Sequence, residues 1–137
     1  MNPAENKKLL QHIFAELAHG NARPLAQNMA DDFTWTVTGS TNWSKKYEGK
    51  RAVIEQLLNR IRDTLAPPVV IEAQRFIADE ECVAVEAKGR NKTSDGVPYN
   101  QTYCFVFRLS GGKLQEVTEY MDTELVTSVF GARATSA

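Results

Sequence analysis

Residues 111–123 (GGKLQEVTEYMDT) contain a turn followed by one strand with two unlike faces. The two glycines supply turn chemistry, and the residues after them alternate between two faces as a half-buried strand does. One face carries Val117, Glu119 and Met121, so the two apolar side chains flank a single acid. Successive strand residues point to opposite faces, and Glu119 must therefore point the same way as its two apolar neighbours. If that face meets the core, the segment places a carboxyl group in apolar surroundings.

Four further segments are predicted to be strands. The first begins at Phe33, where Phe33, Trp35 and Val37 alternate with threonines. The others span about 69–77, 82–90 and 99–109, and the strand of the opening segment spans about 113–122. Gly, Asp, Glu or Ser residues lie at the joints between them, as expected of tight turns.

Helices precede most of these strands. Asn2-Pro3 predicts the start of a first helix, which ends at Gly20. Asn21 is predicted to cap a short second helix that ends at Asp31-Asp32. A polar loop at 39–48 follows the first strand.

A third helix is predicted from Gly49, with apolar residues at helical spacing, and Pro67-Pro68 ends it. Thr123 is expected to cap a last short helix through Phe130, which Gly131 ends. We expect one domain over residues 1–131 and a frayed tail at 132–137.

Composition excludes several classes of function. The 137 residues have a formal net charge of −1, which argues against a nucleic-acid partner because phosphate binding needs a basic face. Cys82 and Cys104 lack metal-binding spacing and are expected to be two buried reduced thiols. No apolar run approaches a membrane span or a signal core, so a cytoplasmic location without membrane contact is expected. No nucleotide or metal motif is present, and no cofactor is implied.

Helices gathered first and antiparallel strands gathered last predict an α+β fold with helices on one face of a curled sheet. The core under such a curl is hard to fill, so a pocket is expected. In its order of elements the chain resembles the nuclear-transport-factor-2-like superfamily, in its SnoaL-like and ketosteroid-isomerase-like branch. The stretches 30–39, 47–54 and 111–123 carry this resemblance. It implies a cone-shaped curved antiparallel or mixed sheet around three N-terminal helices, an internal apolar pocket, and a homodimer formed through the open sheet face.

Two branches of that superfamily fit the residues only in part. The ending Glu119-Tyr120-Met121-Asp122 is similar to the Asp-Tyr-Phe-Asp ending of limonene-epoxide hydrolases, whose first acid acts on the epoxide and its water. The Arg-x-Asp pair that those hydrolases also need falls at Ala87 and Gly89. The oxyanion-hole Tyr and general-base Asp of ketosteroid isomerases fall at Ile13 and Val37. Neither of those two activities is therefore predicted.

Glu119 is the first candidate for a catalytic residue, because a carboxyl group in an apolar pocket has a raised pKa suited to proton transfer. Asp122 is the second candidate, with helix capping as the alternative. The predicted ligand-binding residues are Trp35, Val37, Trp43, Tyr103, Phe105, Val117 and Met121. Trp43, on the polar loop, is interpreted as a lid over the pocket mouth.

Two functions stay open on the sequence. One is SnoaL-like acid–base chemistry, of an isomerisation, cyclisation or hydration type, on a small apolar substrate. The other is non-catalytic binding of small ligands, or a dimeric accessory role, through the same pocket. A second polar group beside Glu119 would favour the enzyme, and a salt bridge to Glu119 would favour the binder.

Overall fold

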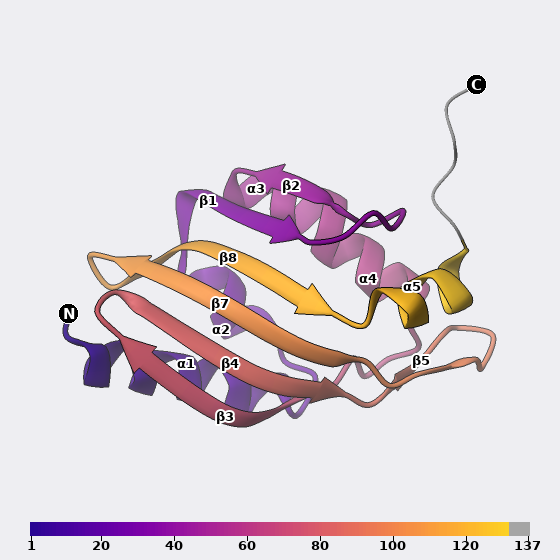
Figure 1. The fold of residues 1–137 in the computed structure, drawn as a ribbon, viewed down its shortest axis with the longest axis horizontal. Coiled ribbons are helices and arrows are strands. Elements are labelled where there is room, and N and C mark those ends of the chain that lie inside the picture. The colour runs from indigo at the N-terminus through magenta and orange to yellow at the C-terminus, as the bar shows by residue number, and fades with distance from the viewer. Residues whose placement is uncertain (132–137) are drawn as a thin grey trace.

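Six strands of the chain form one mixed, curved sheet in the computed structural model, which describes residues 1–131. The strands are β1 (Met29–Val37), β2 (Lys45–Glu48), β3 (Ile71–Asp79), β4 (Cys82–Gly89), β7 (Thr102–Ser110) and β8 (Lys113–Met121). Their order across the sheet is β2-β1-β8-β7-β4-β3 (Figure 1). Neighbours in this sheet are antiparallel except β1 and β8, which run parallel. The short strands β5 (Asn91–Lys92) and β6 (Pro98–Tyr99) pair as a separate hairpin.

The first helix, α1 (Pro3–Leu17), begins where the sequence predicted. The side-chain oxygen of Asn2 accepts a hydrogen bond from the backbone N–H of Glu5 at 2.8 Å, which satisfies a donor that the helix start leaves free. The buried face of α1 lies along β3 and β4, where the ring of Phe14 packs edge-on against Phe76 at 6.0 Å and Phe107 at 6.1 Å. This aromatic group joins the helix to the sheet.

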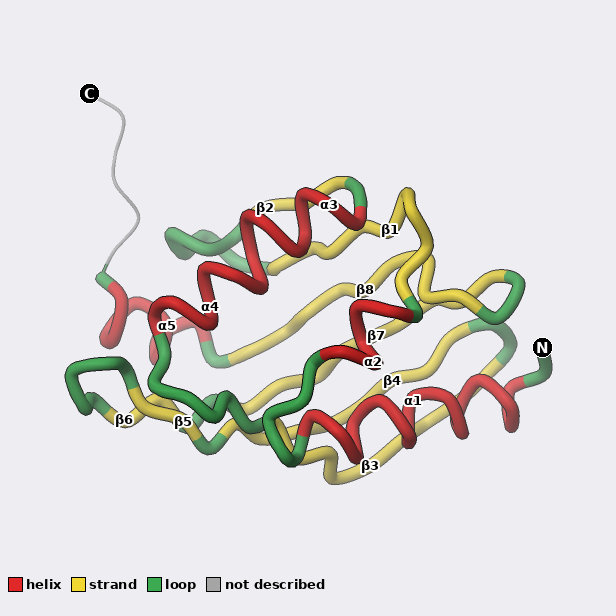
Figure 2. The backbone as a smooth tube through the Cα atoms, turned by 180° about the vertical axis from the view of Figure 1, so that it is seen from behind, coloured by secondary structure: helices red, strands yellow, loops and turns green. Residues whose placement is uncertain are grey.

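The remaining helices cover the same face of the sheet and leave the other face open (Figure 2). They are α2 (Arg23–Gln27), α3 (Lys50–Ala52), a π-helix, η1 (Val53–Leu58), α4 (Asn59–Thr64) and α5 (Thr123–Phe130). The segments α3, η1 and α4 follow one another directly, so the single helix predicted after Gly49 is present with a π-helical middle. The α+β fold with helices on one face of a curved sheet is confirmed.

The predicted end of the second helix is wrong. Helix α2 ends at Gln27, and β1 already begins at Met29, so Asp31 and Asp32 lie inside a strand. The pairing of β1 with β8 shifts register between Met29 and Thr34, and both acids lie exposed at this irregularity. A bulge of this kind tolerates polar residues that a regular strand would place against the core.

The loop predicted at 39–48 contains a strand. Residues Lys45–Glu48 pair with β1, and Tyr47 lies opposite Trp35. Tyr47 is buried, and its hydroxyl donates to the carbonyl of Trp43 at 2.9 Å. This edge strand has four residues and one buried position, which is too little to produce a visible alternation.

The open face of the sheet differs from its expected composition. Alternation along the predicted strands puts Val70, Phe76, Val106 and Tyr120 on the open face. Phe76 instead lies against α1, because the register of β3 against β4 shifts between Ala73 and Arg75. The open face carries Ile77 and Tyr120, which are 52% and 51% exposed, and between them Val106. Ion pairs lie beside them, including Arg75–Glu86 and Arg108–Glu116. Both cysteines are free thiols.

The predicted tail at 132–137 lies outside the described residues. Among residues 1–131, no helix is both long enough and apolar enough to cross a membrane.

Candidate functional site

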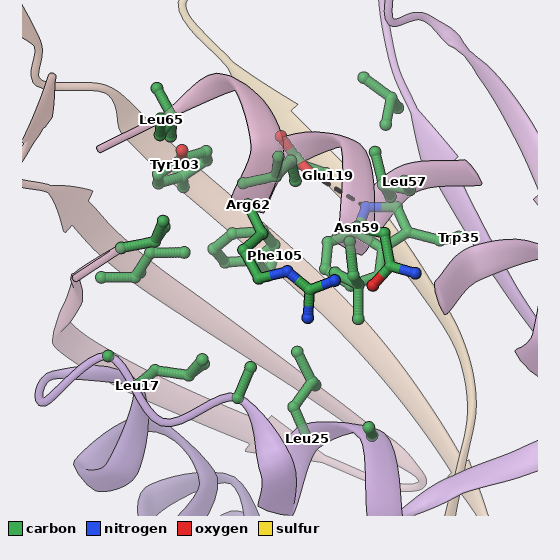
Figure 3. A pocket seen from close by; sticks show the side chains of 18 of the residues that line it. Leu17, Leu25, Trp35, Leu57, Asn59, Arg62, Leu65, Tyr103, Phe105 and Glu119 are labelled. Atoms are coloured by element: carbon green, nitrogen blue, oxygen red, sulfur yellow. Dashed lines mark hydrogen bonds between the residues drawn. The ribbon is translucent and has the colours of Figure 1, made fainter. Parts of the chain in front are cut away.

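A cavity of about 540 Å³ lies between the helices and the concave face of the sheet. Its size falls within the range of small-molecule sites, which is roughly 300–1,000 Å³. Its wall is mostly apolar, and every helix except the short α3 contributes to it. Figure 3 shows Trp35, Phe105 and Glu119 of the sheet on one side and Leu17 and Leu25 of the helical layer on another. The sheet curvature and the short α2 together leave this space unfilled.

Glu119 of β8 lies in the wall of this cavity, on the face that the alternation predicted. Thr38, directly after β1, holds the backbone of Glu119 in place. Both the N–H and the hydroxyl of Thr38 donate to the Glu119 carbonyl, at 3.2 and 2.8 Å. Burial raises the pKa of the Glu119 carboxyl to about 7, because the charged form loses its hydration in apolar surroundings. The group therefore exchanges its proton near neutral pH.

One hydrogen bond holds that carboxyl in place. The indole Nε1 of Trp35 donates to Glu119 Oε1 at 2.9 Å (Figure 3). This donor favours the charged form and lowers the pKa of Glu119, against the larger effect of burial. No ion pair within residues 1–131 involves Glu119. The carboxyl is thus oriented without being neutralised.

Two phenols share the cavity wall with Glu119. Burial raises the pKa of Tyr103 well above its ordinary value and that of Tyr99 to about 12, and the carboxylate of Glu119 raises both further. Both phenols therefore remain protonated donors at neutral pH. The hydroxyl of Tyr99 accepts a hydrogen bond from the side chain of Gln101 at 3.1 Å. The hydroxyl of Tyr103 has no partner among the described residues, so it is available to a ligand.

Polar groups from the helices also reach the cavity. Asn59 and Arg62 of α4 and Arg23 of α2 line it, and none of the three side chains makes a hydrogen bond or ion pair within residues 1–131. We did not predict these residues from the sequence. They lie beside the apolar stripe of their helices, where a polar residue has the same pattern as a solvated surface position.

The structure brings most of the predicted ligand-binding residues together. The cavity wall contains Trp35, Val37, Trp43, Tyr103, Phe105 and Met121. Val117 is the exception: it is 1% exposed and lies outside the wall, packed where β8 pairs with Trp35 of β1 and Phe107 of β7. Val117 therefore belongs to the core, because larger neighbouring side chains cover it.

The interpretation of Asp122 as a catalytic acid is corrected. Its side chain is exposed, lies outside the cavity wall, and accepts a hydrogen bond from the backbone N–H of Leu125 at 3.2 Å. Asp122 is the N-cap of α5, the position predicted for Thr123. Of the two candidate acids, only Glu119 faces the cavity.

Trp43, interpreted from the sequence as a lid over the pocket mouth, is packed into the cavity wall. It is 8% exposed, and its ring lies between the guanidinium of Arg60, 3.9 Å from the ring centroid, and the ring of Phe130 at 5.5 Å. Its backbone N–H donates to the hydroxyl of Thr41 at 3.2 Å. The side chain lines the cavity as part of a packed wall.

Comparison with known proteins identifies the family. A family model described as a SnoaL-like domain matches residues 10–117. No curated protein matches the chain. Several hundred chains of solved structures do, and the three described next are under 25% identical to this chain, so they show the fold alone.

Three of these solved structures illustrate the likeness. An NTF2-like protein of unknown function from Burkholderia pseudomallei has a TM-score of 0.80 at 16% identity, covering 93% of this chain and 98% of its own. A protein proposed to be a SnoaL-like polyketide cyclase, from a Jannaschia species, has a TM-score of 0.77 at 15% identity, covering 96% and 95%. A protein proposed to be an isomerase, from Bacillus subtilis, has a TM-score of 0.78 at 19% identity, covering 98% and 100%.

Proposed function

The chain belongs to the SnoaL-like domain family, and from that premise we propose that it is an enzyme that transfers a proton within a small apolar substrate, with Glu119 as the acid–base group. The observation that carries the proposal is a carboxyl group with a pKa of about 7 in the wall of an apolar cavity. Proton transfer is fastest when the pKa of the catalytic group lies near the working pH. The reaction classes that fit are isomerisation, cyclisation and hydration.

The surroundings of Glu119 support an enzyme over a passive binder. A salt bridge would have fixed the carboxylate in its charged form, whereas a single indole donor leaves both protonation states accessible. The Tyr103 phenol, which lines the same cavity, can donate a hydrogen bond to a substrate oxygen that gains negative charge when Glu119 removes a proton. A base and a separate donor are the two groups that enolisation chemistry needs.

A general proton-transfer probe tests this proposal without knowledge of the natural substrate. In 5-nitrobenzisoxazole, a base removes the C3–H proton of the isoxazole ring, the N–O bond breaks as the nitrile forms, and the product is a coloured cyano-nitrophenolate. We expect the wild type to accelerate this reaction and the rate to rise with pH through about 7, as Glu119 ionises. Glu119→Gln keeps the shape and should lose the acceleration.

Binding of the same probe distinguishes the two functions. Trp35 and Trp43 both line the cavity, so a bound aromatic molecule changes the intrinsic fluorescence. If the probe binds and the wild type and Glu119→Gln convert it at equal rates, the protein is a binder without this chemistry. The absence of any binding would remove the cavity as the functional site.

The open face of the sheet supports a second copy of the chain as partner. Its centre carries Ile77, Val106 and Tyr120, and charged side chains surround them. An apolar centre with a polar rim is the usual composition of a protein interface. We therefore propose a homodimer through this face, which leaves the cavity of each copy on the opposite side of the sheet.

A further inference from the structure

The two arginines and one asparagine of the cavity wall have no role in the proton transfer proposed above, and they point to a class of substrate. The only charged side chains of the wall, within residues 1–131, are Glu119, Arg23 and Arg62. With Glu119 protonated, the wall therefore carries two positive charges and no negative one. An apolar cavity that bound neutral molecules alone would have no use for this excess.

The three polar side chains come from two elements that both line the cavity, α4 and α2. Asn59 and Arg62 are three residues apart on α4, a spacing that places side chains on one face of a helix. Arg23 comes from the first turn of α2. In Figure 3 the amide of Asn59 and the guanidinium of Arg62 extend from α4 into the space above Leu25, whereas Glu119 turns toward Trp35. The positive groups and the acid thus face different parts of the same cavity.

The positive groups are free to bind. The other arginines within residues 1–131 are engaged: Arg51, Arg75, Arg90 and Arg108 form ion pairs, and Arg60 lies over Trp43. Arg23 and Arg62 have no such partner within residues 1–131. Arg62 is exposed, so its guanidinium stays hydrated when the cavity is empty and needs no counter-charge from the protein.

We propose that the substrate is an apolar carboxylate, whose anionic group binds Arg62 and Asn59 at the solvent-exposed mouth, with Arg23 adding positive charge from α2, while its apolar body reaches Glu119. A guanidinium and an amide offer planar N–H donors that match the two oxygens of a carboxylate. Burying the carboxylate among the aromatic residues would be unfavourable because it would lose its hydration there. When Glu119 is ionised, its negative charge also repels the substrate carboxylate and keeps it away from that end of the cavity. The anionic group therefore sets the orientation, and the reacting atoms lie at the other end of the molecule.

This inference rests on the proposed function for its choice of cavity, and matched ligands test it separately. Naphthalene-2-carboxylate and naphthalene-2-carboxamide have nearly the same shape and differ in charge. Their affinities are compared by tryptophan fluorescence at pH 6, where Glu119 is mostly protonated, its pKa being about 7. We expect the wild type to prefer the carboxylate by about tenfold, the size expected for one charge-assisted hydrogen bond.

Three variants identify the groups responsible. Arg62→Gln removes the charge, keeps a shorter polar side chain, and should abolish most of the preference. Arg51→Gln is the matched control, because Arg51 is an exposed arginine of the same long helix that lies outside the cavity wall. It should keep the preference. Glu119→Gln should also keep it, because the acid does not recognise the anion.

The outcomes separate the two proposals. Equal affinity of the wild type for the two naphthalenes, or an unchanged preference in Arg62→Gln, overturns the carboxylate assignment and leaves the acid–base proposal standing. If neither compound binds, the carboxylate assignment fails, and the nitrobenzisoxazole assay alone decides the acid–base proposal. If the carboxylate is preferred but Glu119→Gln matches the wild type in the proton-transfer assay, the anion site stands without the proposed catalysis.

Discussion

The indole of Trp35 and the carboxyl of Glu119 are 84 positions apart in the sequence and are joined by one hydrogen bond of 2.9 Å across the parallel strands β1 and β8. Trp35→Phe removes the donor and keeps an aromatic ring. We expect the pKa of Glu119 to rise above its value of about 7, because the hydrogen bond stabilises the charged form. Carboxyl titration by NMR measures this shift. Trp43→Phe, which alters the other indole of the cavity wall, should leave the titration unchanged, and a fall in Trp35→Phe would contradict the assigned role.

The stability of the protein should depend on the protonation of Glu119. Its folded pKa of about 7 exceeds the ordinary value of 4.5, so the native state binds the proton more tightly than the unfolded chain. The wild type should therefore lose stability relative to Glu119→Gln as the pH rises from about 4.5 to about 7, and no further above that. The full difference is roughly 3 kcal/mol. Denaturant unfolding at several pH values measures it, and parallel curves for the two proteins would show an unperturbed carboxyl.

The open sheet face should hold two copies together. We expect sedimentation velocity at micromolar concentration to give about twice the chain mass of 15.3 kDa. Tyr120→Asp places a charge at the centre of the proposed interface and should give monomers. Lys8→Asp on the exposed side of α1 is the control and should leave the mass unchanged. A monomeric wild type would rule out the dimer.

Replacing Gln101 should lower the stability of the fold more than replacing an exposed glutamine. It is 1% exposed, and its amide both donates to the carbonyl of Asp122 and accepts from its N–H, each at 2.9 Å. Gln101→Ala leaves these backbone groups without their partner and should cost about 1–3 kcal/mol of unfolding free energy. Gln74→Ala, at an exposed position, should change it by less than about 0.5 kcal/mol. Equal effects in chemical denaturation would mean that water replaces the amide.

The sequence predicts correctly that Glu119 faces the interior of the fold, because the evidence for this orientation lies in its immediate neighbours. Val117 and Met121 flank it at a spacing of two, and a strand has no other way to arrange three such residues. Its partner Trp35 is not predictable in this way. That contact depends on β1 lying parallel to β8 in one register, and a shift of one residue would turn the indole to the other face.

The errors have the same origin. Phe76 alternates like a residue of the open face until a register shift between Ala73 and Arg75 reverses it. Asp31 and Asp32 resemble a helix end in the sequence. They can lie within β1 because the irregular pairing of β1 with β8 leaves both side chains exposed to solvent. Arg62 gives no sign of its place, since a cavity-facing arginine and a solvated one have the same sequence pattern. Each of these positions is decided by contacts between distant segments.

The π-helical turn at Val53–Leu58 determines which way the side chains of α4 point, because α4 follows it directly. An α-helix turns by about 100° per residue, and a π-helical segment inserts the equivalent of one extra residue without changing the helix ends. If the same residues, with none deleted, closed as ordinary α-helix instead, Asn59 and Arg62 would rotate by about that angle, away from the cavity. The fold would survive with its acid in place, but the mouth would lose its charge. One inserted residue in a helix can therefore decide which molecules such a cavity admits, independently of the chemistry performed at its far end.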